Sequence, residues 1–304
     1  MNKLPLKKLS IINLLKKIPT FNLGSEKISL DKSIGRFLAE DLVSKINLPP
    51  FKNSAVDGYA LNRKDILQNR SSLILTQRIT AGDKNIKNLK IGKAARIFTG
   101  AKMPTNSDTV VMQENVSSFN EKIRINKMPS NGENCRHAGE DISKGDKIMS
   151  LGDIIDTTNI NLIAAIGKIN ISLQKKLNVG FYTSGNELIN PTEKLEGSQI
   201  NNSNYYSLKT LLNKPYIKSE YLGILKDKES IIKKSLLKKV NKYNVIITTG
   251  GASVGEEDHL VKIINQLGKV YFWKAAIKPG RPLAIGKIKN TIIISAISFC
   301  CRSY

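Results

Sequence analysis

Apolar residues near the N-terminus recur at helical spacing. Leu9, Ile12, Leu15 and Ile18 follow one another at three-residue steps and form a single apolar stripe, which stops before Pro19. Because residues three or four positions apart lie on one face of a helix, this spacing predicts a short N-terminal helix.

A different pattern runs from Ser44 to Asp141. Brief apolar runs rich in β-branched residues alternate with clusters of Gly, Pro, Asn and Asp, as in strands joined by turns. The clearest predicted strands are 72–76, 95–98, 109–112 and 123–125. Residues 44–141 are therefore expected to form a separate, compact β-rich domain.

A connecting stretch follows at residues 142–174. Within it, Ile160–Ile166 has helical apolar spacing, and we expect this segment to pack with the N-terminal helix. Residues 1–43 and 142–174 would then make up an N-terminal helical and connecting region. A domain boundary is predicted near Lys175.

From residue 175 to 304, strands alternate with helices. The expected strands are 177–182, 219–223, 245–248 and 270–274, and the expected helices are about 205–212, 229–239 and 259–267. This alternation implies right-handed crossovers and a mostly parallel sheet covered on both faces, a three-layer α/β/α domain. The fold class predicted for the chain is thus α/β plus a separate β-rich domain. Ligands of such sheets bind at the carboxyl ends of the strands.

The net charge says more about possible binding partners than the overall composition does. The 304 residues are 40% hydrophobic and 24% charged, which is ordinary for a globular protein and excludes collagen-like, coiled-coil and wholly disordered chains. The 48 basic and 25 acidic residues give a net charge of +23. Anionic partners are therefore favoured.

The sequence argues against a membrane or secreted protein. The apolar patch near the N-terminus is interrupted by polar residues, so no signal peptide is expected. The longest near-apolar run, 291–301, is well short of the ~20 residues that span a bilayer. Cys135, Cys300 and Cys301 form neither a disulfide framework nor a Cys-x-x-Cys site. A reducing cytoplasm is the expected location.

The strongest local signal for chemistry is TTGGASVGEED, residues 248–258, between a predicted strand and a predicted helix. Gly250, Gly251 and Gly255 permit tight turns, and backbone N–H groups before a helix bind phosphate. The carboxylates at 256–258 either cap the helix or hold Mg²⁺ against a phosphate. Both interpretations remain open at this stage.

Two further loops follow predicted strands of the same domain. YTSGNEL, residues 182–188, offers Thr183, Ser184 and Glu187; the alternative is a plain turn in which Asn186 caps a helix. WKAAIKPGRP, residues 273–282, contains three cations that suit an oxyanion such as phosphate or molybdate, namely Lys274, Lys278 and Arg281. For a lysine taken alone, a solvated surface position is the commoner explanation.

The β-rich domain contains two unusual segments. PPFKNSAVDGYA, residues 49–60, has a stiff entry and an Asp-Gly turn that could present Asp57 to a ligand. CRHAGEDI, residues 135–142, places Arg136 beside acidic residues, and a surface ion-pair turn is the alternative there. The two histidines, His137 and His259, lie in no metal-binding motif, so zinc is not expected. No Ser-His-Asp arrangement is supported either.

Taken together, these segments resemble the molybdopterin molybdenumtransferase family, the MoeA and gephyrin E-domain proteins. The resemblance extends to about Ile294. It rests on six motifs in family order: NSAVDGYA (53–60), FTGAKMP (98–104), GEDI (139–142), TSGNEL (183–188), TTGGASVGEED and KPGRPLAIG (278–286). It implies a MoaB/Mog-like C-terminal domain.

The resemblance also implies an activity: Mg²⁺-dependent insertion of molybdate into adenylylated molybdopterin, with release of AMP. It implies a homodimer in the cytoplasm, with the upstream molybdopterin adenylyltransferase as a possible partner. Residues carried over as catalytic are Asp57, Glu187, Asp227, Asp258, Lys274 and Lys278. Glu187, Asp227 and Asp258 would hold the metal. Residues expected to bind substrate are Thr99, Arg136, Asp141, Thr183, Ser184, Gly250, Gly251, Ser253, Gly255, Pro279, Gly280 and Arg281.

Three departures from the family pattern stand out. Asn186 replaces an aspartate of the Thr-Gly-Asp-Glu motif, and His137 and Ala138 stand where arginines are common. The family continues with a Pro-Gly-Asn-Pro loop and a C-terminal β-barrel domain, whereas this sequence ends SAISFCCRSY. We expect a truncation or shifted reading frame, which makes an inactive molybdopterin-binding remnant or scaffold the alternative function.

Two other functions are weaker. Nonspecific nucleic-acid binding would use the charge of +23, but the lysines are spread along the chain and no basic motif is interleaved with aromatic residues. An adenylyltransferase acting one step earlier would share the α/β domain but would leave Asp57 and its domain unexplained.

Overall fold

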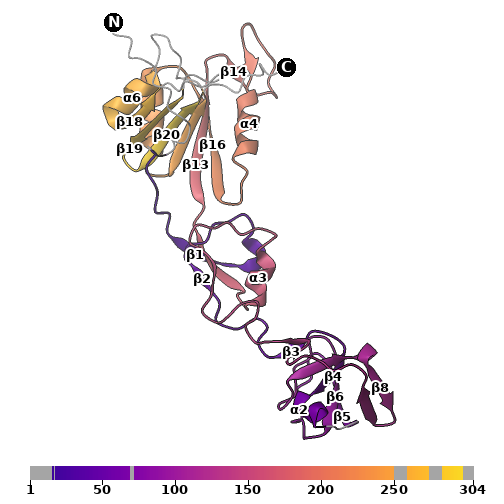
Figure 1. The fold of residues 1–304 in the computed structure, drawn as a ribbon. Coiled ribbons are helices and arrows are strands. Elements are labelled where there is room, and N and C mark those ends of the chain that lie inside the picture. Colours follow the sequence, from indigo (N-terminus) through magenta and orange to yellow (C-terminus); the bar gives the residue numbers. More distant parts are fainter. Residues whose placement is uncertain (1–15, 17, 69–71, 250–258, 274–282, 297–304) are drawn as a thin grey trace. The chain divides into compact units, whose positions relative to one another are not determined.

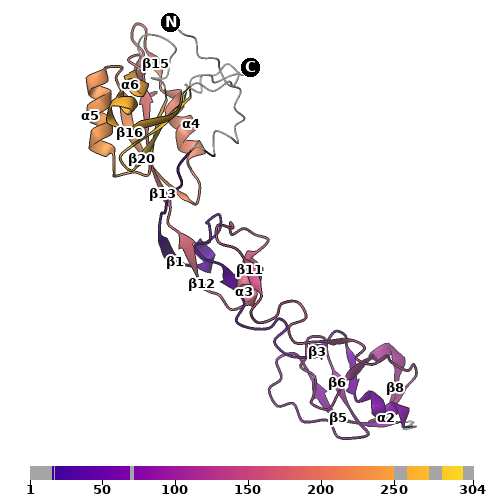
Figure 2. The same ribbon diagram turned by 60° about the vertical axis from the view of Figure 1, so that its left-hand side comes forward.

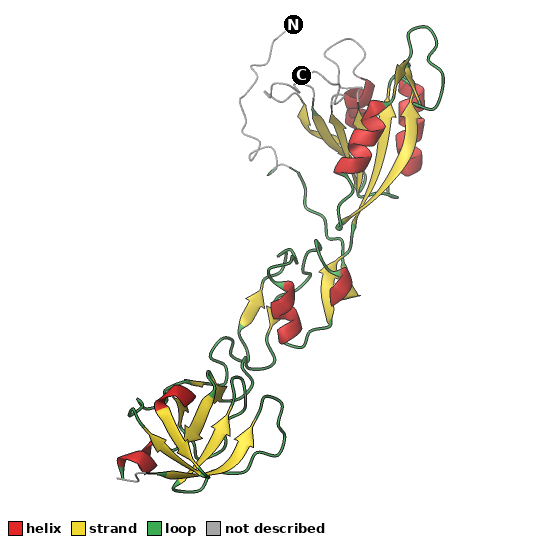
Figure 3. Cartoon of the chain, turned by 90° about the vertical axis from the view of Figure 1, so that its right-hand side faces the viewer, coloured by secondary structure: helices red, strands yellow, loops and turns green. Residues whose placement is uncertain are grey.

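The structure, a computed structural model, describes residues 16, 18–68, 72–249, 259–273 and 283–296. These residues divide into two compact units. The α/β unit comprises Met1–Ala39, Ile154–Asp156 and Ile171–Tyr304, and the β-rich unit comprises Glu40–Asp153 and Thr157–Asn170. Figure 3 shows that both helices and strands build the former, whereas strands predominate in the latter. The predicted helix at 9–18 falls largely outside the described residues.

The α/β unit is built on a six-stranded sheet of order β16-β13-β17-β20-β19-β18 (Figure 1). The first four strands run parallel to one another, which confirms a mostly parallel sheet. Their bounds are β16 Ile217–Leu225, β13 Leu177–Ser184, β17 Val245–Thr249 and β20 Thr291–Ala296.

The other edge of this sheet departs from simple alternation. β18 (Lys269–Trp273) and β19 (Ala284–Ile288) are antiparallel to each other, and β19 is antiparallel to β20. The expected strand at 270–274 is therefore present but not parallel, and β19 was not predicted. The physical reason is a hairpin: two residues join β19 to β20, and Lys289 has the positive φ of 51° that tight hairpin turns require.

Helices cover both faces of the sheet (Figures 1 and 2). α5 (Glu229–Lys239) and α6 (His259–Leu267) have the bounds expected from the sequence and pack on one face, where Ile246 of β17 is fully buried. α4 (Ser203–Leu211) packs on the other face, against Phe181 of β13. Successive residues of the central strands face alternate sides of the sheet, and because helices cover both sides, adjacent residues such as Ile246 and Val245 are both buried.

Smaller pairs complete the α/β unit. β1 (Ser25–Ser29) pairs with β12 (Asn170–Gln174), and β14 (Leu188–Ile189) pairs with β15 (Ile200–Asn201). A short 3-10 helix, η1 (Leu30–Lys32), follows β1.

The β-rich unit contains a second six-stranded sheet, of order β7-β4-β6-β5-β9-β8. All four predicted strands of this region are present. The bounds are β4 Gly58–Leu61, β5 Leu73–Ile79, β6 Lys93–Ile97, β7 Thr109–Met112, β8 Val116–Phe119 and β9 Lys122–Ile125. Gly58 is needed where two strands meet, because an added Cβ would lie 2.1 Å from the Val111 carbonyl oxygen.

Short elements surround this sheet. β3 (Asn53–Ser54) pairs with β10 (Cys135–Arg136), and β2 (Leu42–Val43) pairs with β11 (Lys147–Met149). The helices are α2 (Arg63–Leu67), the 3-10 helix η2 (Gln113–Asn115) and α3 (Ile160–Ala165). α3 confirms the helix expected near 160–166. The three-part division with boundaries at 44, 142 and 175 stays a prediction.

Adjacent leucines of α5 provide a test of the α/β core. Leu236 is fully buried, whereas Leu237 is 44% exposed. Leu236→Ala is expected to lower the free energy of unfolding by about 2–5 kcal/mol, because it leaves a cavity. Leu237→Ala is the control and should cost less than about 0.5 kcal/mol. The single tryptophan, Trp273 in β18, reports unfolding of this unit by fluorescence in urea. Equal midpoints for the two variants would contradict this core.

Candidate functional site

The carboxyl ends of β13 and β17 lie side by side. Thr183 is in register with Thr249, and the hydroxyl of Ser184 donates a hydrogen bond to the carbonyl oxygen of Thr249. The loop that follows β13 therefore starts next to the glycine-rich segment. The predicted residues Gly250, Gly251, Ser253, Gly255 and Asp258 of that segment lie outside the described residues, as do Lys274, Lys278, Pro279, Gly280 and Arg281.

Asn186 joins the loops that carry Glu187 and Asp227. Its side-chain carbonyl accepts a hydrogen bond from the backbone N–H of Asp227 at 3.2 Å, and its backbone carbonyl accepts one from the Lys226 ammonium at 3.3 Å. A second link runs from the Gly185 N–H to the Leu225 carbonyl at 3.1 Å. The structure thus brings the segments of two predicted carboxylates together, and Asn186 provides the acceptor that positions them.

Gly185 has a specific role in this loop. Its φ is 152°, and a Cβ placed there would lie 2.6 Å from Glu187 Oε1. The Glu187 carboxylate therefore folds back over Gly185, where another residue would have to adopt a strained backbone conformation and displace the flexible end of Glu187.

Thr183 belongs to a buried hydrogen-bond network. Its hydroxyl lies 2.9 Å from the Tyr221 hydroxyl, and the Asn202 amide donates to both, at 2.9 and 3.0 Å. Asn202 is 1% exposed, and its carbonyl oxygen accepts from the Tyr205 N–H at the start of α4. The network ties the end of β13 to β16 and α4. Sequence reasoning missed Asn202 and Tyr221, although an Asn just before a helical run is a recognisable capping signal.

A hollow of about 250 Å³ opens beside this network. Its lining residues are Asn190, Pro191, Thr192, Asn202, Tyr205, Tyr206 and Tyr221. The rings of Tyr205 and Tyr221 lie 4.7 Å apart, and the Lys209 ammonium lies 5.3 Å from the Tyr205 ring centre. The Lys209 ammonium also donates a hydrogen bond to the Tyr205 hydroxyl at 3.1 Å, which raises the pKa of Lys209. An aromatic wall with a nearby cation thus adjoins Thr183.

The donors at this edge suit a hard cation. Glu187 and Asp227 offer carboxylate oxygens, the ligands that Mg²⁺ prefers. Among the described residues, no group of three or more His, Cys, Asp or Glu side chains could hold a metal ion. These two carboxylates therefore fit Mg²⁺ only if further oxygen ligands complete the set.

In the β-rich unit, Thr99 holds Asp57. The Thr99 N–H and hydroxyl both donate to Asp57 Oδ1 at 2.8 Å. These two bonds, the backbone one first, lower the pKa of Asp57, and the nearby Arg96 lowers it further. The guanidinium of Arg96 lies 4.8 Å from the Phe98 ring centre. Asp57 is thus an ionised, oriented carboxylate.

Arg136 and Asp141 also come together. The Arg136 guanidinium donates a short hydrogen bond to Asp141 and pairs with Glu140 at 3.4 Å, and these partners raise the pKa of Arg136. Both residues of the Arg136–Asp141 pair are more than a third exposed. The surface ion-pair turn considered from the sequence is therefore what forms.

The short strand β3 lies between the segments that carry three of the predicted site residues. Cys135 pairs with Ser54 of β3, and the Ser54 carbonyl accepts from the Gly100 N–H at 2.8 Å. The segments of Asp57, Thr99 and Arg136 therefore adjoin one another within the β-rich unit.

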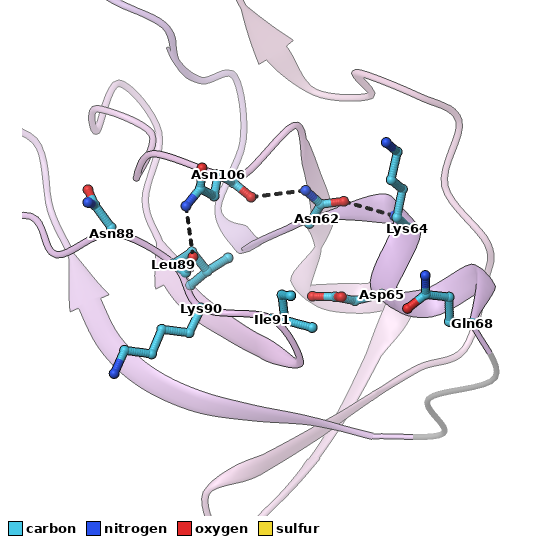
Figure 4. A pocket seen from close by; sticks show the side chains of 9 residues that line it. All are labelled: Asn62, Lys64, Asp65, Gln68, Asn88, Leu89, Lys90, Ile91 and Asn106. Atoms are coloured by element: carbon cyan, nitrogen blue, oxygen red, sulfur yellow. Dashed lines mark hydrogen bonds between the residues drawn. The ribbon is translucent and has the colours of Figure 1, made fainter.

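A hollow of about 760 Å³, larger than the one beside Thr183, is in the β-rich unit (Figure 4). Its lining includes Asn62, Asp65 and Asn106, and no residue of the predicted site lines it. Its polar groups bind one another: Asn62 donates to the Asn106 carbonyl at 3.2 Å, and Asp65 accepts from the Gly92 N–H at 2.8 Å. The volume of a hollow alone therefore does not identify the functional site.

Two family models match the chain. Residues 7–167 match "MoeA N-terminal region (domain I and II)", and residues 180–298 match "Probable molybdopterin binding domain". The molybdopterin molybdenumtransferase of Haemophilus influenzae is 36% identical over 279 residues, which are 91% of this chain and 68% of that protein. The chain belongs to the MoeA family.

Two further members of the MoeA family are similar to this chain over most of its length. The molybdopterin molybdenumtransferase of Nostoc is 31% identical, over 90% of this chain and 64% of its own length. The solved structure of the molybdopterin biosynthesis MoeA protein from Pyrococcus horikoshii superposes with a TM-score of 0.81 at 30% identity, covering 93% of this chain and 74% of that one. The expected fold class is thereby confirmed.

The chain spans 62% to 68% of the length of curated MoeA family transferases from Haemophilus, Nostoc and Staphylococcus. In the part of the chain that the structure describes, no helix combines the length and apolar character needed to cross a membrane.

The effect of the Thr99 hydrogen bonds on the pKa of Asp57 can be tested directly. Thr99→Val removes the hydroxyl donor and should raise the pKa of Asp57 toward its usual value, as read from its carboxyl carbon by NMR. Asp83 is an internal control, because the Thr80 N–H and hydroxyl lower its pKa in the same way. A lowered folded-state pKa stabilises the fold above the unfolded pKa, and this stabilisation is lost as pH falls through the folded value. The variant should therefore be less stable than the unaltered chain at neutral pH, and this difference should disappear below the folded pKa. An unchanged Asp57 titration would contradict this geometry.

Proposed function

We propose that this chain carries out Mg²⁺-dependent insertion of molybdate into adenylylated molybdopterin, with release of AMP. The observation that carries the proposal is the convergence of the segments of Ser184, Glu187 and Asp227 at the carboxyl edge of the sheet, beside Thr249. Curated relatives named molybdopterin molybdenumtransferase support it.

Each end of the substrate has a candidate partner in the α/β unit. We assign the flat pterin ring to the aromatic wall of Tyr205 and Tyr221, because offset stacking favours conjugated rings. The phosphates would lie against the N–H groups of the loop at 250–255. Lys274, Lys278 and Arg281 would bind molybdate and phosphate oxygens.

The carboxylates have a separate task. Glu187, Asp227 and Asp258 would hold Mg²⁺ together with substrate oxygens, and the bound ion would neutralise charge on the phosphate. Asn186 keeps the Glu187 and Asp227 loops together without adding a third negative charge to them. That is a physical reason for the chain to tolerate asparagine where relatives have aspartate.

The β-rich unit contributes an oriented anion in this proposal. Asp57, ionised and held by Thr99, would orient a hydrogen-bond donor or a hydrated metal ion. Arg136 and Asp141 would contact the substrate at the same surface. By analogy with the family, we propose that the protein is a cytoplasmic homodimer in which Asp57 of one subunit acts on the α/β unit of the other. The upstream adenylyltransferase would supply its substrate.

The activity is tested by AMP release from adenylylated molybdopterin with molybdate and Mg²⁺. Glu187→Gln and Asp227→Asn should each lower the rate at least about tenfold, because each removes one anionic metal ligand. Glu196→Gln, on an exposed loop of the same unit, is the matched control. Wild-type rates in both variants would argue against the assigned roles. Pterin binding without AMP release from the unaltered chain would instead favour the pterin-binding remnant.

The dimer has its own test. Mixing a chain carrying Asp57→Asn with one carrying Glu187→Gln should restore part of the activity that each variant loses alone, because one of the two sites would regain both residues. Light scattering should give the mass of two chains. A monomer, or no restoration on mixing, would contradict the shared site.

A further inference from the structure

A second basic region lies in the α/β unit, at the end of the sheet opposite the candidate site. A groove of about 450 Å³ is lined by Glu26, Ile28, Lys32, Arg36, Lys175, Lys176 and Lys218. Lys176 directly precedes β13, and Lys218 is the second residue of β16. The groove is therefore at the amino ends of these parallel strands, whereas Ser184 and Glu187 are at the carboxyl end.

The charge of this groove is largely uncompensated. Glu26 is the only acidic residue in its lining, and its Oε1 already accepts from Arg36 at 2.6 Å. Within the described residues, no ion pair involves any of the four lysines. Glu220 is on the same strand face as Lys218, and its carboxylate accepts from the Tyr243 hydroxyl. The four lysines are exposed, and Asp31 is an acidic neighbour of Lys32, because its pKa is lowered by a side-chain hydrogen bond with Ser29 and in part by Lys32.

Arg36 forms the floor of the groove. It is 4% exposed, and besides Glu26 it donates to the Gln174 carbonyl oxygen at 2.7 Å. Among the described residues its buried Nε has no hydrogen-bond partner. The Glu26 carboxylate compensates the charge of this buried guanidinium, so the net positive charge of the groove comes from its four lysines.

Contacts between the chain segments that line the groove fix the positions of these segments relative to one another. The Lys175 N–H donates to the Gly24 carbonyl at 3.1 Å, and the Leu177 N–H donates to the Tyr216 carbonyl at 2.9 Å. The rings of Phe37 and Tyr216 meet edge to face at 5.0 Å. The fold therefore fixes the backbone positions from which the basic side chains line the groove.

We propose that this groove binds a small polyanion that carries two or more phosphate groups. Lysine ammonium groups suit phosphate oxygens, and several around one concave site can share a multiply charged ligand. The lining contains no aromatic side chain on which the bases of a single strand could stack, and its cations converge instead of forming a stripe. The ligand class is accordingly a polyphosphate or a diphosphate-bearing metabolite. The proposal does not depend on the proposed catalytic function.

The test is calorimetric titration of the full chain with inorganic tripolyphosphate. The variant Lys175→Gln/Lys176→Gln/Lys218→Gln should weaken binding about tenfold or more, because three exposed charge contacts are lost together. The control Lys234→Gln/Lys238→Gln/Lys242→Gln removes the same charge from exposed positions on and after α5, and its affinity should stay within about twofold. Equal urea midpoints by Trp273 fluorescence would show that both variants fold.

Three outcomes would overturn the proposal. The first is no binding by the unaltered chain at low salt. The second is equal weakening in both triple variants, or equal competition by a single-stranded oligonucleotide, because either would indicate nonspecific charge. The third is loss of tripolyphosphate binding in Lys274→Gln/Lys278→Gln/Arg281→Gln with retention in the groove variant, because the probe would then occupy the pterin-nucleotide site.

Discussion

The parallel pairing of β13 with β17 is the constraint on which the candidate site depends. Five residues of each strand are in register, from Val179 opposite Val245 to Thr183 opposite Thr249. This register fixes where two loops leave the sheet, and the Ser184 hydroxyl closes the gap between them by bonding the Thr249 carbonyl. A shift of one residue would move every apolar side chain of a central strand to the opposite face, so core packing and loop placement are specified together.

Much of this architecture could be predicted from the sequence. α5 and α6 begin and end where the apolar periodicity begins and ends, because each has one face against the sheet and the other in solvent. The motifs TSGNEL and NSAVDGYA also correctly predicted loops, which follow β13 and β3 in the structure. In these places local pattern and tertiary structure agree.

The sequence failed where the deciding contact is distant along the chain. β19 contains Gly286, reads as a loop after Pro282 and is a strand only because β18 and β20 flank it. Asn202, Tyr221 and Thr183 meet in one hydrogen-bond network although 19 and 38 positions separate Thr183 from its partners. The groove of Arg36 likewise combines residues 26–36 with Lys175, Lys176 and Lys218. No local sequence motif predicts such contacts between residues that are far apart in the chain.

The interleaving of the two units has a consequence for the order of events on the ribosome. β1 is made early, but its partner β12 is separated from it by residues 30–169, which include nearly all of the β-rich unit. β1 must therefore remain unpaired until nearly all of the β-rich unit has been synthesised. Because contacts so far apart in sequence close slowly, this waiting segment is where a nascent chain would most need a chaperone.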